Sequence, residues 1–233
     1  MSSYSPNMLK TFQSCPQKYW LKYVQKISMP QKSSLFDKGK RIHALAHYYL
    51  RGDDISKLET ALSPQELEVW ENLKKNEYFQ KSYVNSEYNL SCKVGEYWIG
   101  GRLDALMSDT HPLTPSPQGR GNETYYILDY KTGQIPKNPE SDFQTAVYLL
   151  CVSEKLKTLT PNPSPIGRGE TEIKFVYIDL KNKQNCVIDF EKDYEKPIIE
   201  ICDRIKDLQP QEDIEYSKKC EFCEYRKLCC FNT

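Results

Sequence analysis

An α/β fold is predicted by three observations on this sequence of 233 residues. Apolar residues recur at helical spacing through the first 80 residues, and β-branched and aromatic segments separated by turn signals follow. Helical spacing then returns once between further strands and once after them. This order favours a central mixed β-sheet flanked by helices. We therefore expect one domain over 1–233, made of a helical basic segment (1–80), a sheet carrying the candidate catalytic residues (81–190) and a C-terminal helix with a cysteine array (191–233).

The first segment predicts consecutive helices. Ser5-Pro6 combines an N-cap with proline in the first turn and opens a short helix through Leu9 and Phe12. Cys15-Pro16 restarts the chain into a second helical stretch. Longer helices are expected over "SSLFDKGKRIHALAHYYL" and over "SPQELEVWENLKKNEYF".

The middle of the chain predicts strands. Three consecutive strands are expected over "YVNSEYNLSC", "EYWIGGRLDALM" and "YYILDYKT". A helix from about 141 to 156 follows, and then the strands "IKFVYIDL" and "NCVIDF". A last helix carries its apolar residues on one face, namely Ile198, Ile201, Ile205 and Leu208.

Two segments interrupt this pattern. "LTPSPQGRGNET" and "LTPNPSPIGRGETE" share LTP, SP and GRG, and their proline and glycine content predicts exposed loops near 111–124 and 158–171. They resemble the peptide products of palindromic repeat elements that have entered bacterial genes. Because lengthening a surface loop costs little, we interpret both as tolerated insertions. GRG as a phosphate-binding loop is not favoured, since no strand-loop-helix phosphate signature accompanies it.

Charge and cysteine content narrow the class of protein. The formal net charge is zero, yet residues 1 to 51 hold nine Lys and Arg against one acid, Asp37. Such a segment is either a phosphate-facing surface or a set of solvated helix faces. No apolar run is long enough to span a membrane and the N-terminus is not a signal peptide, so a cytoplasmic, reducing environment is expected. There, nine cysteines are expected to be free thiols and metal ligands rather than disulfides.

An acid-x-Lys pair gives the strongest chemical signal. Asp129 and Lys131 alternate along a strand and share one face, while Tyr130 points to the other. If that strand pairs with "GGRLDALM", Asp104 joins them. Mg2+ prefers a few carboxylates with open water positions, and a neighbouring lysine can orient the attacking water. A surface salt bridge explains each residue singly, but the three together favour a catalytic site.

"GGRLDALM", "ILDYKTGQ" and "FQTAVYLL" together resemble the ordered motifs of the PD-(D/E)XK nuclease superfamily, in its RecB-like branch. The resemblance covers nearly the whole chain and implies a restriction-endonuclease-like core. It implies that Asp104, Asp129 and the carbonyl of Tyr130 bind Mg2+ or Mn2+ and that Lys131 positions the water. Gln144 and Tyr148, one helical turn apart, match its Q-x-x-x-Y motif.

Histidines and cysteines extend the resemblance. "KGKRIHALAHYYL" resembles the helix of the family that carries a metal-facing histidine, which is His43 here, whereas His47 is interpreted as a surface or packing residue. "CEFCEYRKLCC" holds a C-x2-C-x5-C array, and three thiolates leave a tetrahedral site open. Iron-sulfur members of this branch, such as the AddB nuclease domain and the CRISPR-associated RecB-like exonucleases, add one cysteine near the start of the chain. The resemblance implies a 4Fe-4S cluster that joins the two ends of the chain, held by Cys15, Cys220, Cys223 and Cys229.

Alternatives remain for the cysteines and for the function. Cys230 competes with Cys229 as the last ligand, and zinc is an alternative to the cluster, although a zinc ribbon usually presents two C-x2-C pairs. Cys92, Cys151, Cys186 and Cys202 are expected to be buried packing residues. The resemblance implies a metal-dependent DNA exonuclease for single strands or DNA ends in repair, recombination or CRISPR adaptation, with little sequence specificity. The alternatives are a non-catalytic nucleic-acid-binding protein and an accessory subunit active only with a helicase or CRISPR adaptation partner.

Overall fold

The structure is a computed structural model that describes residues 3–30, 34–109, 123–159, 171–190, 193–209 and 216–229. In chain order its elements are α1 (Pro6–Ser14), α2 (Pro16–Tyr19), the π-helix η1 (Trp20–Val24), α3 (Ser34–Leu50), α4 (Ser56–Thr60), α5 (Pro64–Lys74), β1 (Ser82–Val94), β2 (Tyr97–Ser108), β3 (Glu123–Lys131), the 3-10 helix η2 (Pro139–Ser141), α6 (Phe143–Leu159), β4 (Thr171–Asp179), β5 (Gln184–Asp189), α7 (Glu195–Lys206) and the 3-10 helices η3 (Lys218–Phe222) and η4 (Arg226–Leu228).

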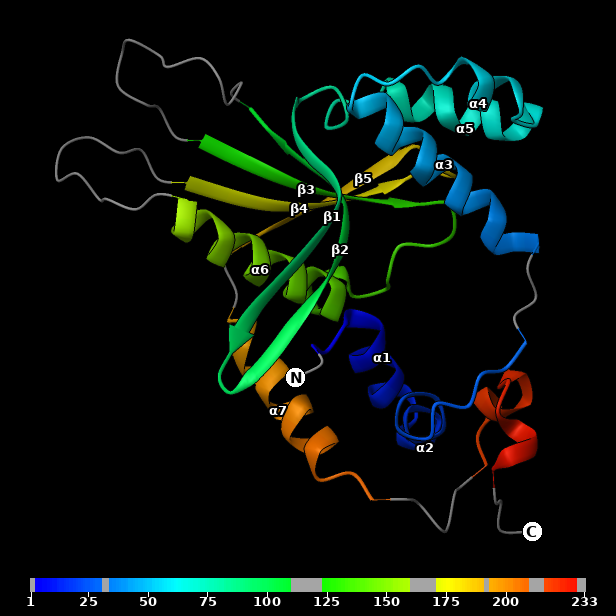
Figure 1. Ribbon diagram of the computed structural model, residues 1–233, viewed down its shortest axis with the longest axis vertical. Helices are drawn as coiled ribbons and strands as arrows, with labels where there is room; N and C mark the ends of the chain where they lie inside the picture. Colours follow the sequence, from blue (N-terminus) through cyan, green and yellow to red (C-terminus); the bar gives the residue numbers. More distant parts are fainter. Residues whose placement is uncertain are drawn as a thin grey trace, which may run out of the picture.

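The strands form one five-stranded mixed sheet in the order β1-β2-β3-β4-β5. β1, β2 and β3 pair antiparallel, β3 and β4 pair parallel through α6, and β5 returns antiparallel to β4. Helices cover both faces, with α6 on one and α3 and α5 on the other (Figure 1). The predicted mixed sheet flanked by helices is confirmed.

Each face of the sheet has its own hydrophobic core. On one face α6 packs with α1 and α7 against the sheet, and its fully buried residues include Val147 and Leu149. On the other face α3 and α5 contribute Ile42, Leu45 and Trp70. Adjacent residues of β3 therefore face different cores, which fixes the sides on which its functional groups lie.

Two strands diverge at the point where the candidate site forms. β1 and β2 pair along nearly their whole length, but the β2–β3 ladder runs only from Ala105 opposite Leu128 to Ser108 opposite Tyr125. Beyond Ala105, β2 separates from β3 and the backbone groups of Asp104 and Asp129 do not pair. The gap leaves room for side chains from both strands and from α3.

The C-terminal 3-10 helices η3 and η4 pack beside α2 and the segment that follows it (Figure 1). The Tyr225 hydroxyl donates to the carbonyl of Ile27 over 2.8 Å, and Lys18 Nζ lies 3.0 Å from Glu224 Oε2. The segment that carries the cysteine array is thus held against the chain just after α2.

Several details differ from the sequence predictions. The second helical stretch continues as the π-helix η1, α4 was not anticipated, and Leu208 lies beyond the end of α7. Glu123 and Thr124 belong to β3, Thr171 belongs to β4, and α6 extends to Leu159, so the predicted loops are too long at these ends; their remainders, like Cys230, lie outside the described residues. Cys186 is half-buried rather than buried, whereas Cys92, Cys151 and Cys202 are buried as expected. The division of 1–233 into segments of one domain stays a prediction.

None of the helices within the described ranges combines the length and the apolar character needed to cross a membrane.

Candidate active site

Asp104 lies where β2 leaves β3. Its Oδ2 accepts a hydrogen bond from the backbone N–H of Tyr130 over 2.9 Å, replacing the ladder pair that would otherwise form there. Its Oδ1 lies 3.1 Å from Nδ1 of His43. Asp104 therefore links the two strands to α3 through its carboxylate.

His43 is held from both sides. Its Nε2 lies 3.1 Å from the carbonyl oxygen of Tyr130, opposite the contact of Nδ1 with Asp104. Burial acts to lower the pKa of His43, but the hydrogen bond and the charge of Asp104 outweigh it and raise the pKa. Two acceptors around one imidazole thus favour its charged form, and the same acceptors would suit a cation.

Asp129 and Lys131 face α6. Nζ of Lys131 lies 2.7 Å from Oδ2 of Asp129, and Nε2 of Gln144 donates to Oδ1 of Asp129 over 2.5 Å. Lys131 also donates to Oε1 of Gln144 over 3.2 Å, which closes a triangle of three side chains. The predicted shared face of Asp129 and Lys131 has formed, with Tyr130 in the opposite core.

The Asp129 carboxyl is incompletely satisfied. The residue is 4 % exposed, and its Oδ2 accepts no well-directed hydrogen bond from the described residues despite the nearby ammonium of Lys131. Burial, together with the charge of Asp104, raises the pKa of Asp129 to about 6, although Lys131 and His43 act to lower it. A buried carboxylate oxygen whose neighbour is the ammonium of Lys131 is a suitable ligand for a cation.

Tyr148 has a supporting position. Its hydroxyl donates to the carbonyl of Arg102 over 2.8 Å, and its ring lies against the backbone of Gly101. A Cβ at Gly101 would stand 2.8 Å from Cε1 of Tyr148, so this approach requires glycine. Tyr148 therefore braces α6 against β2 rather than contacting the two carboxylates.

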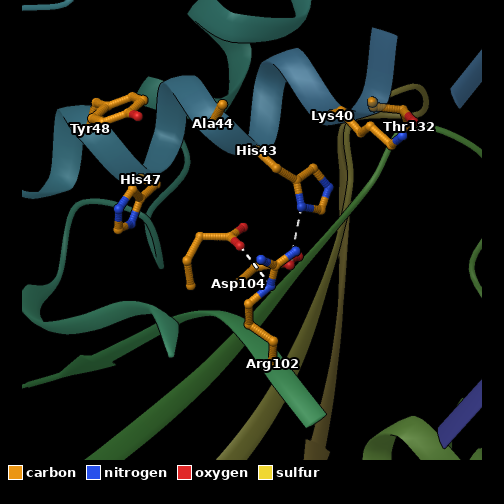
Figure 2. Close-up of a pocket in the computed structure, with 10 residues that line it drawn as sticks. Lys40, His43, Ala44, His47, Tyr48, Arg102, Asp104 and Thr132 are labelled. Carbon is orange, nitrogen blue, oxygen red and sulfur yellow. Dashed lines mark hydrogen bonds and ion pairs between the residues drawn. The ribbon is translucent and has the colours of Figure 1, made fainter. Parts of the chain in front are cut away.

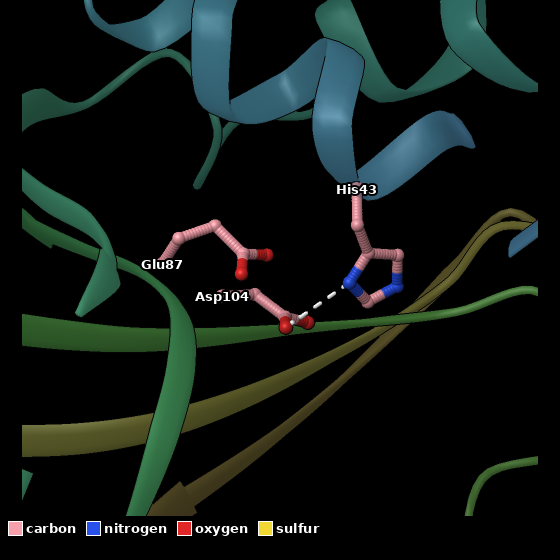
Figure 3. Close-up of side chains that lie close together, drawn as sticks. All are labelled: His43, Glu87 and Asp104. Atoms are coloured by element: carbon pink, nitrogen blue, oxygen red, sulfur yellow. Dashed lines mark hydrogen bonds and ion pairs between the residues drawn. The ribbon is translucent and has the colours of Figure 1, made fainter. Parts of the chain in front are cut away.

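Glu87 belongs to the site although the sequence motifs did not identify it. A ligand atom from each of His43, Glu87 and Asp104 lies within 4.8 Å of the others. Figure 3 shows these three side chains directed toward one another. Glu87 has a left-handed backbone conformation with φ of 48°, and it is not among the paired residues of the β1–β2 ladder. Its carboxylate also forms an ion pair with Nε of Arg102 over 2.8 Å. An acid beside Ser86 and Tyr88 in a strand carries no sequence signal for this geometry. Among the described residues Asp129 adds no ligand atom to this group, but its charge acts on the same imidazole and helps to raise the pKa of His43.

A cavity of about 840 Å³ opens from this group between α3 and the β1–β2 hairpin (Figure 2). Its walls carry the carboxylates of Glu87 and Asp104. They also carry basic and aromatic side chains, among them Lys40, His47, Tyr48 and Arg102. His47 is outside the cation group, because its Nδ1 lies 2.7 Å from Oγ of Ser86. The interpretation of His47 as a surface or packing residue rather than a metal ligand agrees with this contact.

The four cysteines of the predicted cluster come from two ends of the chain. Cys15 is the N-cap of α2, and its Sγ accepts a hydrogen bond from the backbone N–H of Lys18 over 3.3 Å. The side chain of Lys18 forms an ion pair with Glu224, next to the cysteine array. The Cys220 sulfur accepts from the backbone and the hydroxyl of Ser217, contacts that lower the pKa of this thiol. The lowered pKa favours the thiolate form of Cys220, which is the form that binds metals.

Comparison with known proteins gives a family and a fold. A family model described as the PD-(D/E)XK nuclease superfamily matches residues 3–110 and 113–230. The chain is similar to the crystal structure of a protein named "Putative exonuclease" from Eubacterium rectale, with 12% identity, 88% of this chain and 80% of that chain covered, and a TM-score of 0.50. A second crystal structure, SSO0001, covers 94% of this chain and 96% of its own at 15% identity, but its TM-score of 0.36 supports no argument. At these identities the first likeness bears on the fold alone, and no curated protein matches the chain.

Proposed function

The chain belongs to the PD-(D/E)XK nuclease superfamily, and from this premise we propose that it is a divalent-metal-dependent deoxyribonuclease, an exonuclease acting on single-stranded DNA or DNA ends. One observation carries the proposal. His43 and Asp104 meet at the point where β2 and β3 diverge, next to the buried Asp129 and its ion-pair partner, the half-buried Lys131. A surface salt bridge does not need this burial or this histidine.

The groups proposed to hold Mg2+ or Mn2+ are His43, Asp104, Asp129 and the carbonyl of Tyr130, with Glu87 added from the structure. The burial of the Asp129 carboxylate and the contacts of His43 with Asp104 and Tyr130 support this assignment. A divalent cation there lowers the pKa of a bound water and neutralises charge on the phosphate. The donors are oxygens with one imidazole, which is a set that hard cations accept.

Lys131 is proposed to orient the attacking water and to balance charge that builds on the phosphodiester. Its ammonium is half-buried and is fixed by Asp129 and by the side-chain oxygen of Gln144. Gln144 thereby sets the position of both groups, and Tyr148 holds α6 at the distance from β2 that this arrangement needs. A preorganised cation beside the reacting group contributes to the rate because it needs no reorganisation.

Degradation of end-labelled single- and double-stranded DNA with Mg2+ or Mn2+ tests the activity. We expect wild-type protein to shorten strands from an end and Lys131→Ala to lose this activity with its fold intact. Lys174→Ala is a matched control, because Lys174 has similar exposure in β4 but pairs with Asp189. Undiminished cleavage by Lys131→Ala would refute the proposed role.

The cysteines are proposed to hold a 4Fe-4S cluster that closes the domain. The Lys18–Glu224 ion pair and the bond from Tyr225 to Ile27 support it, since both bring the array to the segment after Cys15. After anaerobic purification we expect iron, sulfide and visible absorbance in the wild type, and their loss with a lowered melting temperature in Cys223→Ser. Cys186→Ser, outside the array, is the control. Zinc in place of iron would select the alternative metal, and a stable protein free of both would exclude the cluster.

A helicase or CRISPR adaptation protein is proposed as a partner, with the cytoplasm as the compartment. The competing function is a non-catalytic nucleic-acid-binding or accessory subunit. It predicts that purified protein is inert towards DNA and that Asp104→Ala leaves every measured activity unchanged.

A further inference from the structure

The cavity beside the cation group is larger than a metal site requires. It encloses about 840 Å³ between α3 and the β1–β2 hairpin, and His43, Glu87 and Asp104 lie in its wall (Figure 2). Volumes of this order hold small organic ligands of about the size of a nucleotide. The space therefore suits one strand that reaches the cation group.

Tyr48 presents an aromatic ring to this space. It is 41 % exposed and lines the cavity, whereas the next residue, Tyr49, packs against Trp70 and Phe79 with ring centroids 5.3 and 5.9 Å away. Tyr49 is 44 % exposed but its ring contacts two core rings, whereas the ring contact given for Tyr48 within the described residues is with His47. An accessible ring beside a charged site is suited to stacking on a base.

His47 gives the Tyr48 ring a fixed neighbour. The two ring centroids lie 5.4 Å apart, and Nδ1 of His47 is anchored by the buried hydroxyl of Ser86 at 2.7 Å. Ser86 is itself 3.2 Å from the hydroxyl of Tyr83. This chain of contacts fixes the imidazole in the wall, so the aromatic surface is formed before any ligand arrives.

Basic side chains line the cavity together with the carboxylates of Glu87 and Asp104. Arg102 has a side chain 64 % exposed, and its Nε lies 2.8 Å from Oε2 of Glu87. Lys40, on α3, lines the opposite side. Carboxylates for a cation, basic groups for phosphate and a ring for a base together match the parts of one nucleotide.

We propose that this cavity is a nucleotide subsite next to the scissile phosphodiester, in which Tyr48 stacks on a base of a single strand while Arg102 and Lys40 hold its phosphate. The assignment rests on the proposed nuclease function. Stacking does not discriminate between bases, so the subsite accepts any sequence but requires a base. It also makes the unpaired strand, rather than the duplex, the form bound at the site.

Fluorescence anisotropy with two labelled strands of equal length tests the subsite, one of oligothymidylate and one with every base replaced by an abasic tetrahydrofuran residue. Both carry the same phosphates, so only the bases differ. Lys131→Ala protein with Mg2+ serves as the parent so that strands stay intact. Adding Tyr48→Ala is expected to weaken binding of oligothymidylate by roughly 5- to 150-fold and to leave abasic binding unchanged. Tyr48→Phe, which keeps the ring, is expected to retain the affinity.

Trp98→Ala is the matched control, because Trp98 is 43 % exposed on β2 but lies outside the cavity wall. Equal losses for both strands in Tyr48→Ala, no loss for either, or the same loss in Trp98→Ala would each overturn the subsite. Wild-type cleavage of oligothymidylate is measured in parallel. If the wild type cleaves and the Tyr48 result is negative, only the subsite fails; if neither cleavage nor binding occurs, the nuclease function fails and the subsite with it.

Discussion

Replacing Gln144 by leucine is expected to raise the pKa of Asp129. Gln144 donates to Oδ1 of Asp129 over 2.5 Å, and leucine keeps much of the volume but has no N–H. A hydrogen bond to a charged group contributes about 1.5–3 kcal/mol. At about 1.4 kcal/mol for each pKa unit, its loss is worth about one to two units. Little of this is screened by solvent, because Asp129 is buried.

The direction follows from the charge state that the bond favours. Burial and Asp104 already raise the pKa of Asp129 to about 6, and the N–H of Gln144 stabilises the ionised form. Without that donor the carboxyl stays protonated to a higher pH. Because a cation binds the ionised carboxylate, the acid limb of the plot of cleavage rate against pH should move to higher pH with the pKa of Asp129.

Carboxyl ¹³C NMR titration of metal-free protein measures this pKa directly, and the pH dependence of kcat/KM with Mg2+ gives the acid limb. Tyr148→Phe is the control one turn along α6, since it removes only the hydroxyl that bonds the carbonyl of Arg102. An unchanged Asp129 titration in Gln144→Leu, or an equal shift in Tyr148→Phe, would refute the reasoning.

Three further changes test other parts of the molecule. Glu66 belongs to the capping box of α5 and accepts a hydrogen bond from Arg41, and the hydrogen bonds from Ser63 lower its pKa to about 2 from an ordinary 4.5. Its carboxylate therefore stabilises the fold above pH 4.5, and this contribution declines as the pH falls toward 2. Urea unfolding should show that Glu66→Gln is less stable than wild type at neutral pH and equal to it near pH 2, and a difference that persists at pH 2 would contradict this. Glu87→Gln should weaken Mn2+ binding on the order of 10- to 100-fold in calorimetry, and an affinity equal to wild type would exclude Glu87 from the cation site. Gly101→Ala should lower the free energy of unfolding by about 1–3 kcal/mol because its Cβ meets the Tyr148 ring, and an unchanged urea midpoint would show that the ring yields freely.

Local patterns predicted most of the fold. Helical spacing with the Ser5 and Ser63 caps located the starts of α1 and α5, and alternation located every strand to within a few residues. These signals depend on neighbours in the chain, so they are visible before folding. The short α4 and the π-helix η1 escaped because each is too short to show a period.

The candidate site was predicted in part. Alternation along one strand already required Asp129 and Lys131 to share a face, and helical spacing required Gln144 and Tyr148 to do so. Resemblance supplied His43, which the structure brings to Asp104. Roles for these residues stay proposals. The same motifs implied one convergent set of carboxylates, and the structure adds the contacts of each: Asp129 contacts Lys131 and Gln144, and Asp104 lies with His43 and Glu87.

By itself, the sequence determined the order of elements, the α/β class and the acid-x-Lys pair, because hydrophobic periodicity and strand alternation are properties of consecutive residues. Only the tertiary structure decided where β2 leaves β3, which opens the site, and that Glu87 enters it through a left-handed residue. It also decided that His47 turns to Ser86 and leaves Tyr48 at the cavity. Each of these depends on contacts between segments far apart in the chain, and no local pattern encodes the distance at which such segments meet.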